Sequence, residues 1–171
     1  KNVVLKIYDF PIFFLPKFSH PDPTVRRRSG FLAPILTTST TVGSGFAVPY
    51  FWNISKDKDF TFTPKLYAKE NPLLLGEYRQ DFINSFLIVD GGYTQGYKKQ
   101  TEKKSSGGRA HFFSKFRKDF IKNNEIESNL EINLQRSSND TYFKVHDINT
   151  SLVDKNIDIL ENKVDYVYQT D

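Results

Sequence analysis

Polar and apolar residues alternate along most of the chain, and this period of two predicts β-strands rather than helices. From Gly30 onward the alternation falls into segments of about ten residues, separated by turn residues. Eight consecutive strands are predicted, at residues 30–39, 45–54, 59–69, 73–82, 85–97, 109–119, 126–136 and 157–168. Another strand is expected at 2–10, ahead of a proline-containing aromatic stretch at 11–16.

Each predicted strand has one apolar face and one polar face. In 126–136 the polar face carries Glu127, Asn129, Glu131, Asn133 and Gln135. The apolar positions of the eight strands include Phe46, Tyr50, Trp52, Phe60, Phe62, Leu66, Leu74, Tyr78, Phe82, Leu87, Val89, Tyr93, Phe112, Phe116, Leu130, Ile132, Leu134, Val164, Tyr166 and Tyr168. The pattern predicts an antiparallel, all-β fold in which the polar face of the sheet contacts water.

The connections between the strands differ in length on the two sides. On one side, the connections at 55–58, 83–84 and 121–125 are short. On the other side, 40–44 and 70–72 are short, but 98–108 and 137–156 are long. Transmembrane β-barrels combine alternating strands with tight turns at one end and longer loops at the other. Antiparallel sheets of soluble sandwiches alternate as well. The pattern therefore leaves open an outer-membrane barrel, a porin-like channel included, and a soluble β-sandwich that binds carbohydrate through its aromatics.

Composition narrows the classes of protein. Of the 171 residues, 38% are hydrophobic, fewer than the roughly 45–50% of a typical globular domain. Aromatic residues reach 15%, which argues against a disordered chain. The net charge of +4 is spread along the sequence, so nucleic acid is not an expected partner. The chain begins at Lys1 without Met and stops inside the last predicted strand, and we expect a fragment of a larger protein.

Residues that carry chemistry are sparse. With no cysteine, the chain offers no disulfide, thiolate ligand or thiol nucleophile. His20, His111 and His146 lie too far apart in sequence for a metal signature. Neither a nucleophile elbow nor a phosphate-binding glycine loop occurs. We expect no catalytic residue, no metal site and no cofactor, and hence a protein that is not an enzyme.

Two prolines and three arginines are the candidate site residues. Pro34 and Pro49 lie inside the first two of the eight strands, and proline cannot donate to a ladder. They are either ordinary edge or bulge prolines or a deliberate weakness in strand pairing. The three arginines are Arg26, Arg27 and Arg28. They could bind lipid phosphates, which guanidinium groups bind bidentately, or form a solvated charge cluster at the rim of the sheet; we favour the second role.

Four motifs in one order carry a family resemblance: RRSGFLAP at 27–34, VPYFWNI at 48–54, DFTFTPKLY at 59–67 and GEYR at 76–79. They resemble the LptD/OstA family of outer-membrane lipopolysaccharide-assembly proteins. The stretch PIFFLP at 11–16 is similar to the family's segment between a periplasmic β-jellyroll and the barrel. DTYF at 140–143 is similar to a stretch after the seventh strand, whereas Gln80 departs from the family's usual tyrosine.

The resemblance implies a fold, partners and a location. Residues 1–28 would be the end of the periplasmic β-jellyroll, including its last strand, followed by a linker. Residues 29–171 would be the N-terminal part, about eight strands, of an antiparallel transmembrane β-barrel in the cell outer membrane. The implied function is transport of lipopolysaccharide into the outer leaflet. The implied partners are lipopolysaccharide, the lipid bilayer, an LptE-like lipoprotein plug and an LptA-like periplasmic bridge protein.

The resemblance also bears on the prolines, because the family's prolines at positions matching Pro34 and Pro49 are associated with a lateral gate. It favours the gate over an ordinary bulge for these two residues. Pro64, in the third strand, has a weaker claim.

Overall fold

A computed structural model of the chain describes residues 3–7, 10–15, 27–96, 98, 107–123, 126–139, 141–154, 156 and 159–170. Two antiparallel sheets and one short helix make up the regular structure of these residues. The all-β class predicted from the alternation is confirmed.

The smaller sheet pairs β1 (Val3–Ile7) with β2 (Phe10–Leu15). β1 confirms the strand expected within 2–10, although Phe10 belongs to β2, and the proline-containing stretch that follows is itself a strand, which the sequence did not predict. The register shifts between Leu5 and Lys6, and Lys6 stands opposite Pro11. A shift of this kind accommodates a residue without a backbone donor, which an undisturbed ladder does not.

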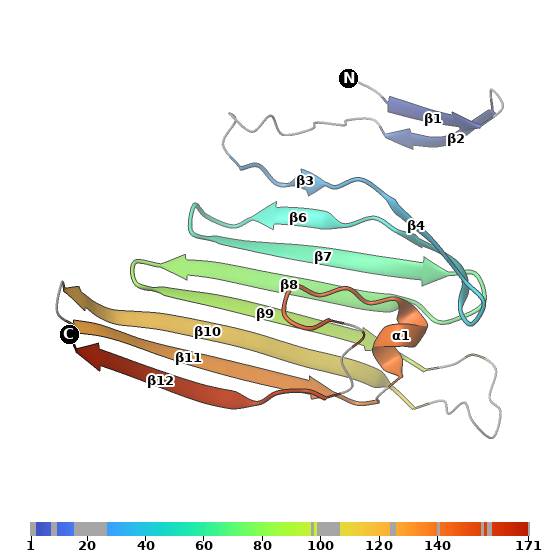
Figure 1. Ribbon diagram of the computed structural model, residues 1–171. Coiled ribbons are helices and arrows are strands. Elements are labelled where there is room, and N and C mark those ends of the chain that lie inside the picture. Colours follow the sequence, from blue (N-terminus) through green and yellow to red (C-terminus); the bar gives the residue numbers. More distant parts are fainter. Residues whose placement is uncertain are drawn as a thin grey trace.

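The larger sheet has ten strands, all antiparallel to their neighbours. They are β3 (Gly30–Phe31), β4 (Ile35–Ser39), β5 (Gly43–Ala47), β6 (Tyr50–Asn53), β7 (Lys58–Tyr67), β8 (Leu73–Phe82), β9 (Ser85–Thr94), β10 (Arg109–Asn123), β11 (Ile126–Ser137) and β12 (Lys163–Thr170). Neighbouring strands follow one another in sequence from β12 to β7 (Figure 1). β3 and β4 are two parts of one predicted strand, and so are β5 and β6. The ten strands therefore correspond to the eight predicted.

Strand register places the predicted apolar positions on one face of this sheet. Leu36 stands opposite Phe46, and Phe46 opposite Leu66. At the other edge, Ile132 lies between Phe116 and Val164. Many side chains of this apolar face are exposed, among them Leu36 (76%), Tyr166 (62%) and Trp52 (52%).

The opposite face, which carries the polar positions, is partly covered by the chain after β11. Figure 1 shows helix α1 (Tyr142–His146) and the segment that follows it lying against the sheet over β8 and β9. The buried hydrophobic cluster forms here, from Val42, Tyr67, Leu73, Phe113, Tyr142, Phe143, Ile148 and Val153. Buried polar residues share this face, including Asp59, Lys65, Asp90, Arg109 and His111. The sheet therefore buries its polar face and exposes its apolar face, the reverse of a soluble sandwich.

The connections sort by end of the sheet, as the sequence predicts. One end has the short connections 54–57 and 83–84 and the one between Asn123 and Ile126, whereas the other has the short 40–42 and 68–72 together with the long connections from β9 to β10 and from β11 to β12. The last of these contains α1, which the alternation gave no reason to expect. Among the described residues, no helix is long and apolar enough to cross a membrane.

Candidate functional site

The first two strand paths are interrupted at their prolines. Pro34 lies in the gap between β3 and β4, and Pro49 lies between β5 and β6. On one side of the interruption β4 pairs with β5, and on the other side β3 pairs with β6. Between these two ladders, the backbone N–H of Leu32 donates to the carbonyl of Pro49 at 2.8 Å.

The interruption is a bulge. Ile35 pairs with Ala47, and Phe31 pairs with Tyr50, so three residues (32–34) of the first path stand opposite two (48–49) of the second. An extra residue of this kind disrupts the ladder and bends the strand. On the other side, β7 pairs with β5 and then with β6 without a change of register. The distortion is therefore confined to the edge of the sheet, and we call this region, residues 30–53, the edge hairpin.

Pro64 lies in β7 at the same level of the sheet. It stands opposite Leu74 in β8, inside an unbroken strand of ten residues. Its other neighbours are Val48 and Pro49, where the pairing of β7 passes from β5 to β6. Three adjacent strand paths thus lack an N–H donor along one line across the sheet, while β8 continues without interruption.

The arginine cluster meets the sheet at the end with the short turns. The Arg27 guanidinium contacts Asp59 at 3.1 Å, and Arg79 Nε contacts the same carboxylate at 2.9 Å. Asp59 is 2% exposed. Asn53 Nδ2 donates to the carbonyl of Arg27 at 2.9 Å, and the Asn53 N–H donates to Ser29 Oγ at 2.9 Å. These bonds tie residues 27–29 to the first strands of the sheet.

The long connection after β11, residues 138–162, docks on the polar face, and we call it the inner loop. Lys65 Nζ donates to the carbonyl of Asp147 at 2.9 Å, and the Tyr67 hydroxyl donates to the carbonyl of His146 at 3.0 Å. Further along, Ser151 Oγ donates to Glu77 Oε2 at 2.9 Å. Strands β7 and β8 therefore hold the inner loop through side chains that belong to their polar positions.

Aromatic packing fixes the helix of the inner loop. Phe143 stacks on Phe113 with ring centroids 5.3 Å apart, and Phe113 is fully buried. His111 lies among Phe113, Tyr142 and Phe143, and its Nε2 is 2.7 Å from Asp90 Oδ1. The helix ends at Asp147, which adopts a left-handed conformation (φ 47°) and lets the chain turn back over the sheet.

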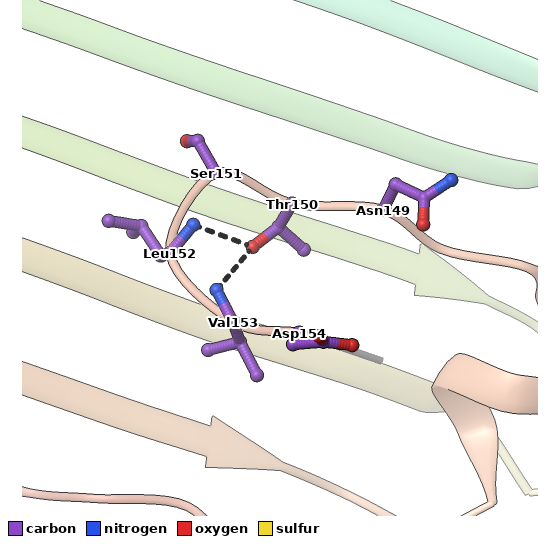
Figure 2. Close-up of a pocket in the computed structure, with 6 residues that line it drawn as sticks. All are labelled: Asn149, Thr150, Ser151, Leu152, Val153 and Asp154. Carbon is purple, nitrogen blue, oxygen red and sulfur yellow. Dashed lines mark hydrogen bonds between the residues drawn. The ribbon is translucent and has the colours of Figure 1, made fainter. Parts of the chain in front are cut away.

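The return of the inner loop is a tight turn at 149–154, shown in Figure 2. Thr150 Oγ1 accepts hydrogen bonds from the N–H groups of Leu152 and Val153, both at 3.0 Å. This threonine turn points Val153 into the buried cluster. The turn surrounds a hollow of about 400 Å³. The residues that line it all belong to this one turn, so the hollow depends on the conformation of a single segment.

No family model matches the chain. Among curated proteins, it is 29% identical to the LPS-assembly protein LptD of Legionella pneumophila strain Paris over its whole length. It is 30% identical to the LptD of Nitrosococcus oceani over 96% of its length. Against the LptD of Psychrobacter cryohalolentis, identity is 40% over 78 residues, or 46% of the chain. The chain belongs to the LptD family.

The chain spans about a fifth of the length of these LptD relatives, since it covers 21% of the Legionella and Nitrosococcus proteins. The family resemblance in the motifs at 27–34, 48–54, 59–67 and 76–79 agrees with this membership. These motifs are also the residues that build the edge hairpin, its bulge and the Asp59 contacts.

Within this LptD segment, the predicted site residues lie in two places. Pro34 and Pro49 share the bulge of the edge hairpin, and Arg27 lies at the end with the short turns. Arg28 is exposed, and Arg26 lies outside the described residues. His111 and His146 meet through Tyr142, which contacts both rings, whereas His20 lies outside the described residues. The described residues contain no group of three metal-ligating side chains.

Reasoning from the sequence missed the residues that hold the inner loop. Lys65, Tyr67 and His146 are ordinary members of an alternating strand or a polar loop, and nothing local marks them. A partial signal existed in the aromatic pair Tyr142–Phe143 inside a polar connection, because a solvated loop rarely needs two adjacent large rings.

The Asp59 contacts give a first prediction, about the attachment of residues 27–29. Asp59→Asn removes the charge that two arginines share, so we expect trypsin to cleave after Arg27 and Arg28 several-fold faster in the assembled protein. Asp57→Asn is the matched control, because the Asp57 carboxylate bonds Ser55 in an exposed turn. Equal cleavage of all three proteins would show that Asp59 does not hold the linker.

A second prediction concerns His146. Burial, with Arg109 and Lys65 nearby, lowers the pKa of His146 from 6.5 to about 4. The docked loop therefore holds a neutral imidazole, whereas the undocked loop binds a proton below pH 6.5. Docking is complete above that pH and is lost as the pH falls towards 4, by up to about tenfold per pH unit.

Hydrogen exchange of the Val145 and Ile148 amides, expressed as protection factors, measures this docking. His146→Phe keeps a ring beside Tyr67 and removes the titration, so its protection should change less between pH 7 and 5. Asp147 within the inner loop, and Asp90 and Glu77 that face it, are present in both proteins, so the difference between the two proteins isolates His146. The same loss of protection in parent and variant would exclude His146 as the cause.

Proposed function

We propose that the chain is the first part of the barrel wall of a lipopolysaccharide translocon, preceded at 1–28 by the end of a periplasmic β-jellyroll. The observation that carries the proposal is the inversion of the large sheet, with large apolar side chains exposed on one face and ionisable groups buried on the other. In a membrane barrel, the apolar face contacts hydrocarbon and the polar face lines the lumen. The name of the relatives, LPS-assembly protein LptD, indicates lipopolysaccharide as the transported lipid.

The edge hairpin supplies the exit in this proposal. Lipopolysaccharide has a polar headgroup and acyl chains, so it must leave the lumen sideways to enter the outer leaflet. The wall parts most readily where the fewest backbone hydrogen bonds resist, at the bulge of Pro34 and Pro49. The proposed activity is transport rather than catalysis, because the states before and after the step differ only in the position of the lipid.

The ends of the strands give the proposed orientation. The short turns at 54–57, 83–84 and 124–125 face the periplasm, and the inner loop starts from the extracellular end. Arg27 and Asp59 then lie at the periplasmic rim, where the jellyroll joins the barrel. An LptA-like bridge protein would deliver the lipid to the jellyroll, and an LptE-like lipoprotein would occupy the lumen.

Conditional depletion of the complete gene tests the function. We expect lipopolysaccharide to stop reaching the cell surface, and an intact copy to restore it. A copy lacking 30–53 should restore neither delivery nor a folded barrel. A porin-like channel would behave differently, because its loss reduces uptake of small solutes and leaves lipopolysaccharide at the surface.

A further inference from the structure

One residue at the tip of the edge hairpin is buried in the hydrophobic cluster to which the inner loop contributes. Val42, in the connection between β4 and β5, is 2% exposed and belongs to the cluster that Tyr142, Phe143 and Ile148 build. Its neighbours Thr40 and Thr41 are exposed. One residue of the tip thus belongs to the same buried cluster as Tyr142, Phe143 and Ile148, which are far from it in sequence.

Tyr67 stands between β5 and the inner loop. A Cβ on Gly45 would lie 2.9 Å from Cδ1 of Tyr67, so the ring lies directly against β5. The hydroxyl of the same ring donates to the carbonyl of His146, and the two rings are 5.6 Å apart. A displacement of either β5 or the inner loop therefore disturbs the packing of Tyr67.

Lys65 provides a second link, two residues earlier on β7. It stands opposite Ala47, the last residue of β5, and its ammonium group donates to the carbonyl of Asp147. Lys65 is buried. Two successive inward-facing residues of β7 thus hold the inner loop at the level where β7 also pairs with β5.

We propose that the inner loop is a latch for the edge hairpin. The bulge at Pro34 and Pro49 lets the hairpin bend near its middle, and the docked inner loop holds its Val42 tip against the sheet. The seam opens only when the inner loop undocks, so Tyr67, Phe143 and Ile148 are positioning residues of the gate. The consequence for transport rests on the gate proposed above, whereas the coupling of loop and hairpin does not.

The coupling is measured as a distance in the complete protein. Spin labels at Thr41→Cys, on the hairpin tip, and Gln95→Cys, after β9, report how far the tip moves from the central strands. Ile148→Ala removes packing from the buried cluster, and Tyr67→Phe removes the hydrogen bond to His146 while keeping the ring against Gly45. Both variants should shift the distance distribution to longer values and broaden it.

Asn149→Ala is the matched control, because Asn149 is exposed and adjacent to Ile148. Its distribution should superimpose on that of the parent. Should Ile148→Ala fail to assemble, Tyr67→Phe alone decides. Unchanged distances in a variant whose inner loop has lost hydrogen-exchange protection would overturn the latch.

Delivery of lipopolysaccharide separates the latch from the gate. In the two latch variants, delivery per folded protein should equal or exceed that of the parent, because an obstacle to opening has been removed. A fall in delivery would overturn the latch by giving the inner loop a direct role in passage. If distances shift but substitution of both prolines leaves delivery unchanged, the gate fails and the coupling stands.

Discussion

Ile132→Arg should destabilise the assembled barrel by about 2–4 kcal/mol, the cost of placing arginine near the middle of a bilayer on the lipid face. Ile132 is in the middle of β11, with Phe116 and Val164 as its cross-strand neighbours. All three side chains belong to the apolar face. The measurement is a folding titration of the complete protein into lipid vesicles. Leu130→Arg, nearer the end of the same strand, should cost less.

Asn129→Arg is the control on the opposite face of β11. Asn129 stands opposite Asp119, so the introduced guanidinium gains a carboxylate neighbour and stays in a polar region. We expect its effect on the free energy of unfolding to be within about 0.5 kcal/mol. Equal costs at Ile132 and Asn129 would contradict the assignment of lipid and lumen faces.

Pro34→Ala combined with Pro49→Ala should slow delivery of lipopolysaccharide several-fold while the barrel still assembles. Each alanine restores an N–H donor, and a backbone hydrogen bond contributes about 1 kcal/mol. A ladder that runs without interruption from β3–β6 into β4–β5 raises the free energy needed to part these strands. The readout is lipopolysaccharide at the cell surface, divided by the amount of folded protein.

Pro72→Ala controls for the loss of a proline as such. Pro72 is exposed and lies in the connection between β7 and β8, outside the bulge of the edge hairpin. Delivery should remain at the parent's level in this variant. If the double variant also delivers normally at normal protein level, the two prolines are ordinary bulge residues.

The alternation predicted the faces of the large sheet because side-chain direction in a strand depends only on whether a position is odd or even. A slip of one residue would invert a whole strand, so register is strongly specified wherever the two faces differ. Leu66 and Leu134 fall on the expected face although they lie in strands far apart in the sequence. The position of the bulge was readable too, from proline's missing donor.

The docking of the inner loop could not be predicted from the sequence. Its contacts join residues 65–77 to residues 146–151, and no local pattern links segments so far apart. The helix at Tyr142–His146 has five residues, too few to show a helical period. The last strand was predicted at 157–168, of which 157 and 158 lie outside the described residues. It begins at Lys163, because Glu161 and Asn162 form hydrogen bonds with Gln135 outside the regular ladder.

The most direct test of the account is the environment of adjacent residues on one strand. This segment has no cysteine of its own, and single spin labels are placed in it at Phe62→Cys or Thr63→Cys of β7, and at Leu134→Cys or Asn133→Cys of β11. In the complete protein in bilayers, labels at 62 and 134 should collide mainly with oxygen dissolved in hydrocarbon. Labels at 63 and 133 should collide mainly with a water-soluble nickel chelate. Four labels equally accessible to the chelate would contradict a membrane wall.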